Sequence, residues 1–370
     1  MKYPSELLKE IFDKREGETI DVPSIEWEGY DVFDATRFHI VGTTEANRHS
    51  LYRFSEEELK KASSASLDVG HLAMYSAGVA IMFATDSRIV KVRVRNLEPF
   101  AMKNMTFMGC SGVDSYYRDE KGEWKFNASA FASFLDTNVW TDYPMVFHDK
   151  KKRDVMLNLP LYNGVVEMEI FVEKGSLVQP IGFENKKRIM IYGTSIVNGC
   201  CASHPGACIS NIMMRKLHQE VLNYGFSGAA NCEKEIAEIL STREDVEMTI
   251  IDCEANAGVS SLMAERLEDF LDVLFKAHPK TPVVLFNRVR QSYDDYFPEM
   301  QRMKEFNDRV LKENCEDFRK RGYPIFFVDN FALIDGEETV EGLHPTDAAL
   351  GKIAKSYLDA IGMVREEEKR

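Results

Sequence analysis

The sequence predicts an α/β protein, in which a parallel sheet covered by helices on both faces follows an all-β domain. Two observations predict this fold. Between residues 188 and 361, apolar strand-like runs alternate with helical segments, which is typical of a parallel sheet. Between about residues 27 and 182, short strands and turns follow one another with few helices, which favours a β-sandwich of the jelly-roll type.

A chain of 370 residues is long for one hydrophobic core and indicates two domains. We place the first at residues 1–184 and the second at residues 185–370, with the charged run at 184–188 as the linker between them. A short amphipathic helix is expected near the start of the chain, at residues 5–14, where a serine cap precedes four apolar residues on one face.

The first domain is expected to consist mainly of strands. Continuous or alternating apolar character predicts them at 79–85, 89–95, 112–117, 123–126, 153–159 and 165–172. A turn at Gly122 joins two of these strands into a hairpin, and residues 56–62 are expected to form a helical or loop insertion. Trp140 and Tyr162 either pack in the sandwich core or are exposed and stack on a sugar ring.

In the second domain, five strands and five helices are expected in alternation. The strands are predicted at 188–192, 220–224, 247–253, 282–287 and 324–329, and the helices at 208–217, 231–240, 262–277, 297–321 and 346–361. Because crossover connections in such sheets are right-handed, the loops that follow the strands meet at one edge of the sheet.

Composition excludes several classes of protein. A net charge of −14 argues against a nucleic-acid or anionic-membrane partner, and no run of 18 apolar residues or secretory signal is visible. The seven cysteines have no metal-ligand spacing, and no P-loop or dinucleotide-binding run is found, so we expect reduced thiols, no metal and no cofactor. We therefore expect a cytoplasmic protein; its oligomeric state stays open, a homo-oligomer included.

The candidate nucleophile is Ser195, which follows the short apolar strand at 188–192. Gly193 allows a sharp turn and leaves the serine at the carboxyl end of the strand, where ligands bind in open α/β sheets. A helix that begins there directs free backbone N–H groups at its first residue, so a developing oxyanion would have a partner. The alternative is an ordinary turn.

The candidate base is His344, in a loop just before the last helix. A neutral imidazole titrates near working pH and can take the proton from a serine hydroxyl. Glu341 lies three residues earlier and would hold the other ring nitrogen, as the acid of a triad does. Two alternatives stay open: a serine–histidine dyad supported by a backbone carbonyl, or Asp335 as the acid.

Four sequence blocks, each after a predicted strand, resemble the SGNH (GDSL-type) hydrolase superfamily. They contain Ser195, Gly228 within Gly-Phe-Ser-Gly, Asn256 within Asp-Cys-Glu-Ala-Asn, and His344 within Glu-Gly-Leu-His-Pro. The resemblance implies a flavodoxin-like sheet of order 2-1-3-4-5 and an oxyanion hole formed by the Ser195 and Gly228 backbone N–H groups and the Asn256 side-chain amide. Glu341 stands where the family normally has aspartate, and Ala229 where many relatives have asparagine.

The first half resembles the β-sandwich domain of one branch of that superfamily, which includes carbohydrate esterases. The matching stretches are Tyr-Asp-Val at 30–32, residues 71–77, Ser-Gly-Val-Asp-Ser-Tyr at 111–116 and Leu-Pro-Leu-Tyr-Asn-Gly at 159–164. Ser115 replaces the leucine of the branch's Gly-X-Asp-Leu-Tyr run. Two substrate-contacting residues are expected: His204, where an arginine is common in the branch, and Arg288, for which a surface salt bridge is the alternative.

These observations together predict a serine esterase that removes a short acyl group, expected to be acetyl, from a small-molecule or oligosaccharide ester. The acetyl and carbohydrate preferences rest on the resemblance to the branch. The alternative is a carbohydrate-binding protein on a catalytically silent scaffold, which the unusual Glu341 and Ala229 leave open.

Overall fold

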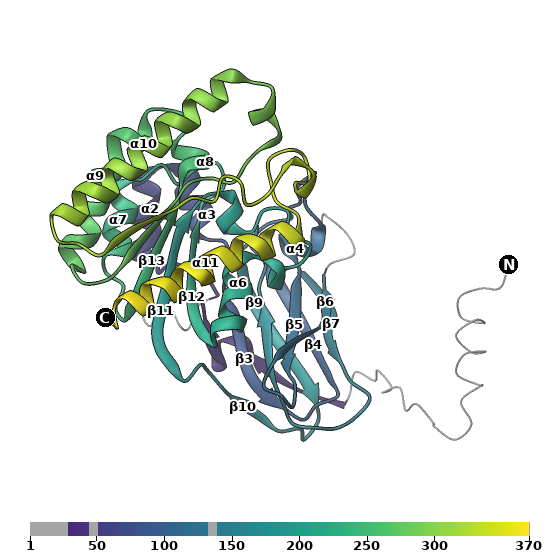
Figure 1. Ribbon diagram of the computed structural model, residues 1–370. Helices are drawn as coiled ribbons and strands as arrows, with labels where there is room; N and C mark the ends of the chain where they lie inside the picture. The colour runs from purple at the N-terminus through teal and green to yellow at the C-terminus, as the bar shows by residue number, and fades with distance from the viewer. Residues whose placement is uncertain (1–28, 44–50, 132–138, 370) are drawn as a thin grey trace.

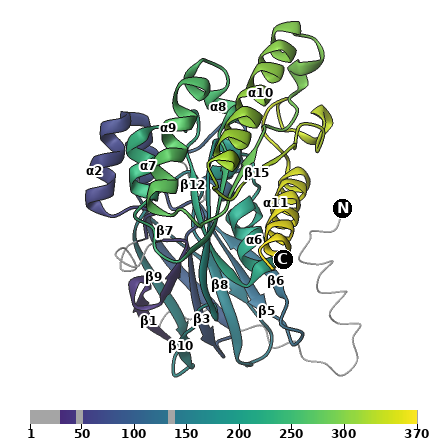
Figure 2. The ribbon, with the colours of Figure 1, turned by 60° about the vertical axis from the view of Figure 1, so that its left-hand side comes forward.

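The computed structural model describes residues 29–43, 51–131 and 139–369 and shows three sheets (Figures 1 and 2). The predicted class, a mixed α/β protein with a parallel sheet after antiparallel ones, is confirmed. The helix expected at residues 5–14 lies outside the described residues. No helix in the described ranges is long and apolar enough to cross a membrane.

Two antiparallel sheets pack face to face in the first half of the chain. One has the order β1 (Tyr30–Asp34), β9 (Val165–Glu173), β4 (Ile89–Asn96) and β7 (Val139–Val146). The other has the order β10 (Val178–Pro180), β3 (Ala80–Thr85), β8 (Arg153–Asn158), β5 (Val113–Arg118) and β6 (Trp124–Ala130), and β2 (His39–Val41) also pairs with β3.

The space between these sheets is filled by one apolar cluster. Strand alternation turns side chains such as Phe83, Val92, Leu157 and Ile170 inward, where they are fully buried. Trp140 belongs to this cluster and Tyr162 to a second one, and both side chains are buried, so neither is available for stacking on a sugar.

The second half forms a five-stranded parallel sheet. Its order is β12 (Gln219–Gly225), β11 (Asn185–Gly193), β13 (Val246–Asp252), β14 (Val283–Phe286) and β15 (Ile325–Val328). Residues 189–192 of β11 and 248–251 of β13 are buried, because helices cover both faces of the sheet there.

Two helices, α6 (Ile209–Leu217) and α11 (Asp347–Glu367), pack together on one face of this sheet. On the other face lie α7 (Lys234–Leu240), α9 (Leu262–Ala277) and α10 (Pro298–Lys320) (Figure 2). Shorter segments lie between the strands and the longer helices. They are the helices α5 (Ser195–Asn198) and α8 (Glu254–Ala257), and the 3-10 turns η4 (Pro205–Ala207), η5 (Ser292–Asp295) and η6 (Gly336–Glu338).

The insertion between β2 and β3 is helical and packs against the parallel-sheet half. It contains α2 (Glu56–Ala65), which begins with a Ser55–Glu58 capping box, and α3 (Leu67–Ala73). Helix α2 contacts α7. The remaining elements of the first half are η2 (Ala35–Arg37) and α4 (Phe107–Ser111).

Candidate active site

Ser195 lies at the carboxyl end of the central strand β11, as the first residue of α5. The strand can turn this tightly because residue 193 is glycine: a Cβ there would lie 2.5 Å from both the Asp252 carbonyl oxygen and a Val197 methyl group. Thr194 caps α5 with its side chain. As a first helical residue, Ser195 has a backbone N–H without an intrahelical partner.

The loop before α11 brings His344 to this serine. Its Nε2 lies 2.9 Å from the Ser195 Oγ, which is hydrogen-bonding distance. The loop is held by a bridge between Thr339 and Pro345 and by a 2.8 Å bond from the Val340 N–H to the His344 carbonyl. Two residues that are 149 positions apart in sequence thus lie within hydrogen-bonding distance.

Glu341 holds the opposite side of the same imidazole. Its carboxylate contacts His344 Nδ1 and also accepts a 3.2 Å bond from the His344 backbone N–H. From the first half of the chain, the Asn104 Nδ2 donates a 3.0 Å bond to the Glu341 Oε1. The extra methylene of glutamate is therefore accommodated, whereas Asp335 caps η6 through the Glu337 N–H.

In the pair of Glu341 and His344, each side chain stabilises the charged form of the other. Burial opposes ionisation of Glu341, but the hydrogen bonds from His344 and Asn104 outweigh it and lower the pKa of the carboxylate. Burial also opposes the charged form of His344, whereas the neighbouring Cys200 and Glu341 raise the pKa of the imidazole to about 9.

The loop after β12 carries Gly228, whose φ of +67° lies in the left-handed region and whose Cβ position faces open space. Among the described residues, its backbone N–H has no hydrogen-bond partner. The Asn256 amide nitrogen donates to the carbonyls of Phe226, at 3.1 Å, and Ala229. The side chain of Asn256 therefore fixes the loop that presents Gly228, and both of its amide hydrogens are engaged.

Two cysteines that sequence reasoning assigned to packing lie beside the candidate base. The Cys200 and Cys201 sulfurs are 3.7 Å apart, and with a His344 ring nitrogen all three atoms lie within 4.8 Å of one another. The hydrogen bond to Cys201 and the nearby His344 lower the pKa of Cys200, although burial opposes this shift. The same hydrogen bond raises the pKa of Cys201. These three residues are the ones that could hold a metal ion in the part of the chain that the structure describes.

His204 contacts the first half of the chain. Its Nδ1 is bonded to the Asp114 carboxylate, and its ring lies 4.7 Å from the Phe126 ring. The same carboxylate accepts from the Gly206 N–H, so it fixes the loop between α5 and α6 against the antiparallel sheet. The contacts of His204 found among the described residues involve neither Ser195 nor His344.

Arg288 follows β14 and is only 4% exposed. Asp294 binds its guanidinium with two oxygens, at 2.7 and 2.5 Å, and Glu254 accepts from its backbone N–H. Its observed role is a buried ion pair that ties the loop after β14 to η5. This is close to the alternative that the sequence left open, except that the pair is buried.

A shallow groove runs alongside Glu341. It is lined by the 3-10 turn η5, by η6 and by the loop that carries Glu341, and its volume is about 690 Å³. Tyr296 is 63% exposed at its edge. The acidic side chains of Asp295, Asp335 and Glu337 also line it, so the groove is polar.

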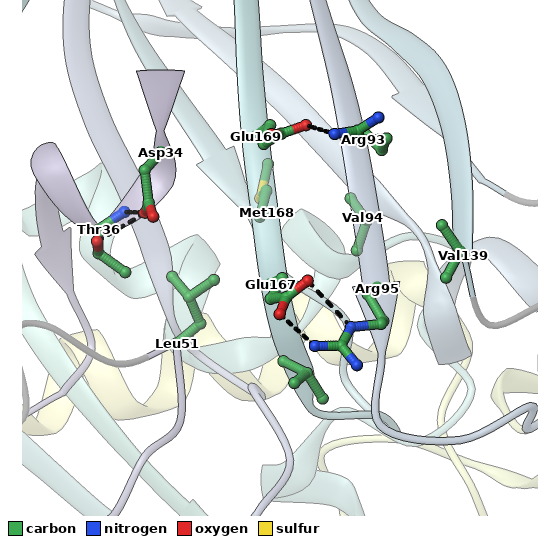
Figure 3. A pocket seen from close by; sticks show the side chains of 11 residues that line it. Asp34, Thr36, Leu51, Arg93, Val94, Arg95, Val139, Glu167, Met168 and Glu169 are labelled. Carbon is green, nitrogen blue, oxygen red and sulfur yellow. Dashed lines mark hydrogen bonds and ion pairs between the residues drawn. The ribbon is translucent and has the colours of Figure 1, made fainter. Parts of the chain in front are cut away.

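A second pocket, of about 360 Å³, lies on the outer face of the sheet that contains β4 and β9 (Figure 3). Its charged side chains pair with each other: Arg95 with Glu167 and Arg93 with Glu169. Its lining contains no aromatic side chain among the described residues. The pocket therefore offers no stacking platform for a sugar.

Sequence reasoning missed Asn104, Cys200 and Cys201 as members of the site. Asn104 comes from a loop of the first half, and no pattern in the chain relates it to Glu341. The adjacent cysteines were visible in the sequence, but their proximity to His344 depends on how two loops fold. The proximity of the cysteines to a candidate base could be found only from coordinates.

Two protein families match the chain. Residues 186–362 match the GDSL-like lipase/acylhydrolase family, and residues 30–178 match the N-terminus of SGNH-hydrolase-type esterases. No curated protein matches the chain.

Solved structures share the fold over most of the chain. A GDSL-like lipase from Bacteroides ovatus is 24% identical with a TM-score of 0.84, covering 91% of this chain and 98% of its own. The salicylyl-acyltransferase SsfX3 of a tetracycline biosynthetic pathway is 17% identical with a TM-score of 0.64, covering 92% and 97%. A family two carbohydrate esterase from Cellvibrio japonicus is 12% identical with a TM-score of 0.58, covering 91% and 98%.

Proposed function

Because residues 186–362 match the GDSL-like lipase/acylhydrolase family and the chain is a carboxylic ester hydrolase, we propose that Ser195 is its nucleophile, His344 its base and Glu341 the acid of a triad. The observation that supports this most is the 2.9 Å contact between the Ser195 Oγ and the His344 Nε2, with the opposite ring nitrogen on Glu341. Neutral His344 takes the serine proton as Oγ attacks the ester carbonyl, and Glu341 stabilises the imidazolium that forms.

The oxyanion of the tetrahedral intermediate is proposed to bind the backbone N–H groups of Ser195 and Gly228 and the amide of Asn256. Within the described part of the chain, neither of the first two N–H groups has a hydrogen-bond partner that would compete with the oxyanion. Asn256 reaches the oxyanion once it releases one of the two loop carbonyls to which it donates. Imidazolium then protonates the leaving alcohol, and water hydrolyses the acyl-enzyme by the same steps.

The proposed substrate is a short-chain ester of a carbohydrate or a similar polar alcohol, and we propose acetyl as its acyl group. The polar groove beside Glu341, with Tyr296 at its edge, supports a polar alcohol part. The similarity of fold to a carbohydrate esterase is consistent with this choice. In the cell we propose a cytoplasmic location.

Hydrolysis of p-nitrophenyl acetate tests the residue assignment. Ser195→Ala and His344→Ala are each expected to lower kcat by about 10⁴-fold or more, because they remove members of a triad. Ser260→Ala, in an exposed loop, and His148→Ala, on the first half of the chain, are matched controls that keep the parental rate. Activity that survives Ser195→Ala would reject the assignment.

The same assay with acetylated xylan fragments, acetylated monosaccharides and longer acyl esters ranks the substrates. A binding protein without catalysis is the alternative, and the pocket on the first half would be its site. That pocket lacks aromatic side chains, which disfavours it. Parental protein that binds acetylated xylan but hydrolyses no ester would establish the alternative.

A further inference from the structure

Two adjacent cysteines present their sulfur atoms on the same side of the chain, next to His344. Neighbouring residues in extended chain point in opposite directions, but here the backbone turns at Gly199, with φ of +108°, and at Cys201, with φ of +66°. A positive φ is uncommon for a residue other than glycine. Bonds from the Cys200 N–H to the Ser195 carbonyl and from the Ala202 N–H to the Gly199 carbonyl hold this turn.

The spacing of the two sulfur atoms matches that of two cysteine ligands on a tetrahedral zinc ion. A zinc ion with Zn–S bonds of about 2.3 Å separates two sulfur ligands by about 3.8 Å. The Cys200 and Cys201 sulfurs lie 3.7 Å apart, and a ring nitrogen of His344 lies within 4.8 Å of both. If His344 binds the ion through Nε2, Glu341 on Nδ1 takes the place of the second-shell carboxylate of a histidine–zinc site.

We propose that Cys200, Cys201 and His344 bind a thiophilic divalent ion, best matched by Zn²⁺, and that the bound ion inhibits the esterase reversibly. Cys200 and Cys201 bind as thiolates and His344 binds as neutral imidazole, so the protons that these three groups hold in the metal-free state are released to solvent. Water or the Ser195 Oγ completes the four ligands. Ions that prefer oxygen ligands, such as Mg²⁺ and Ca²⁺, do not match this donor set.

Inhibition follows whichever ring nitrogen binds the ion. If Nε2 binds it, the lone pair that faces Ser195 is occupied. If Nδ1 binds it, the neutral imidazole carries its proton on Nε2 and cannot accept another. Inhibition rests on the proposed role of His344 as the base, whereas binding of the ion does not.

The metal-free state is held by competing contacts, which keeps binding reversible. The Cys201 thiol donates a 3.0 Å bond to the Asn104 carbonyl, and this bond is lost when the sulfur binds an ion. Cys200 is fully buried and Cys201 is 7% exposed, and the side chain of His344 beside them is 12% exposed.

The first experiment measures the rate of p-nitrophenyl acetate hydrolysis in zinc chloride and in a chelator. The ratio of these two rates is calculated for each variant and compared between variants. Zinc is expected to inhibit the parental enzyme at micromolar concentration, and chelator to restore the rate. Cys200→Ser and Cys201→Ser should each raise the inhibitory concentration by about tenfold or more. Cys315→Ser, in α10, is the matched control and should respond as the parent does.

The second experiment detects the ion directly with Co²⁺ in place of zinc. A thiolate-to-cobalt charge-transfer band is expected in the parent and in Ser195→Ala, and is expected to be absent in the Cys200→Ser/Cys201→Ser double variant. Thermal unfolding of each variant shows that it is folded. Because Ser195→Ala needs no activity for this measurement, failure of the proposed catalytic role and failure of the metal site are distinguished.

Two results would overturn the proposal. One is a folded double variant that zinc inhibits at the same concentration as the parent, because the ion would then act elsewhere. The other is a folded parent that shows no thiolate-to-cobalt band, or shows it without any loss of activity.

Discussion

At the scale of single residues, the candidate site depends on what surrounds one imidazole. His344 has Ser195 on one side, Glu341 on the other and the Cys200 thiol nearby. Each neighbour favours a different state of the ring: the serine needs it neutral, the carboxylate favours its charged form, and the thiol offers a second proton partner. Substitutions of these neighbours are therefore expected to change the pH dependence of the rate as well as its size.

Replacing the acid tests whether a triad or a dyad operates. Glu341→Gln is expected to lower kcat/KM by about 10⁴-fold, less than Ser195→Ala lowers it, because the charge that stabilises the imidazolium is lost. The base must be neutral, so kcat/KM rises with pH through the pKa of His344. Glu341 raises that pKa, so the rising limb should move to lower pH in the variant. An unchanged pH–rate profile, measured in chelator, would indicate a dyad.

Asn104 is expected to act as a positioning residue through Glu341. Asn104→Ala removes a hydrogen bond to a carboxylate and should lower kcat by about tenfold, with KM little changed. The rising limb of the pH–rate profile should also move to higher pH, because a Glu341 carboxylate that has lost this donor accepts more strongly from His344 and stabilises the imidazolium more. Asn314→Ala, on α10, is the control. A lower melting temperature without a change in the pH profile would indicate a structural role only.

At the scale of elements, most of the helices and strands of the second half could be predicted from the sequence. Helix α9 has the predicted bounds, and α10 differs by one residue at each end. Helix α11 extends six residues beyond the predicted 361, because Val364 continues its buried face. Local periodicity decides where such elements lie, and this is why the sequence is sufficient for them.

Side-chain contacts between elements could be predicted only in part. The sequence predicts that Ser195 and His344 lie close together, because both follow strands of one sheet whose carboxyl ends meet at one edge. The engagement of Asn256 with loop carbonyls and the ion pair of Arg288 depend on loop geometry that no periodicity encodes. The same holds for Asn104, which comes from the other half of the chain.

Strand β13 carries a buried acid whose titration is expected to affect stability. Burial, opposed by a 2.5 Å bond from the Tyr357 hydroxyl, raises the pKa of Asp252 to about 7. The folded protein binds this proton more tightly than the unfolded chain. The stabilisation is therefore complete below the unfolded pKa and is lost as pH rises through the folded value.

Asp252→Asn should remove that dependence. Melting temperatures measured between about pH 5 and about pH 8 are expected to fall less steeply with pH in the variant than in the parent. Asp269→Asn, on the outer face of α9, is the matched control and should follow the parental curve. Parallel curves for the parent and Asp252→Asn would show that Asp252 does not titrate in this range.

The turn between η5 and α10 is expected to contribute to substrate preference. Tyr296→Ala should raise KM for acetylated xylan fragments by about tenfold more than for p-nitrophenyl acetate, because an exposed ring beside a polar groove can stack on a sugar. Phe306→Ala, which is exposed on α10 outside the groove, should leave both KM values unchanged. Equal effects of Tyr296→Ala on the two substrates would reject this role.

At the scale of the whole molecule, the two halves share a hydrophobic core. The cluster that contains Ile191 of β11 also includes Phe54, Leu72 and Tyr162 from the first half. Arg53 is buried among backbone carbonyls of both halves, with bonds of 3.1 Å to Tyr75, 3.2 Å to Asn223 and 2.8 Å to Gly225. The sequence suggested a boundary near residue 184, because composition and periodicity change there, but periodicity does not show which half covers which surface.

The fragment 185–370 is therefore expected not to fold alone into an active enzyme. Without the first half, the apolar surface that Phe54, Leu72 and Tyr162 cover would be exposed to water, and Glu341 would lose its bond from Asn104. We expect the fragment to show no cooperative thermal unfolding and no hydrolysis of p-nitrophenyl acetate. Addition of the fragment 1–184 should restore both in part, if the shared core is the cause. A fragment 185–370 that unfolds cooperatively at the parental temperature and hydrolyses the ester would show instead that the first half contributes neither core nor site.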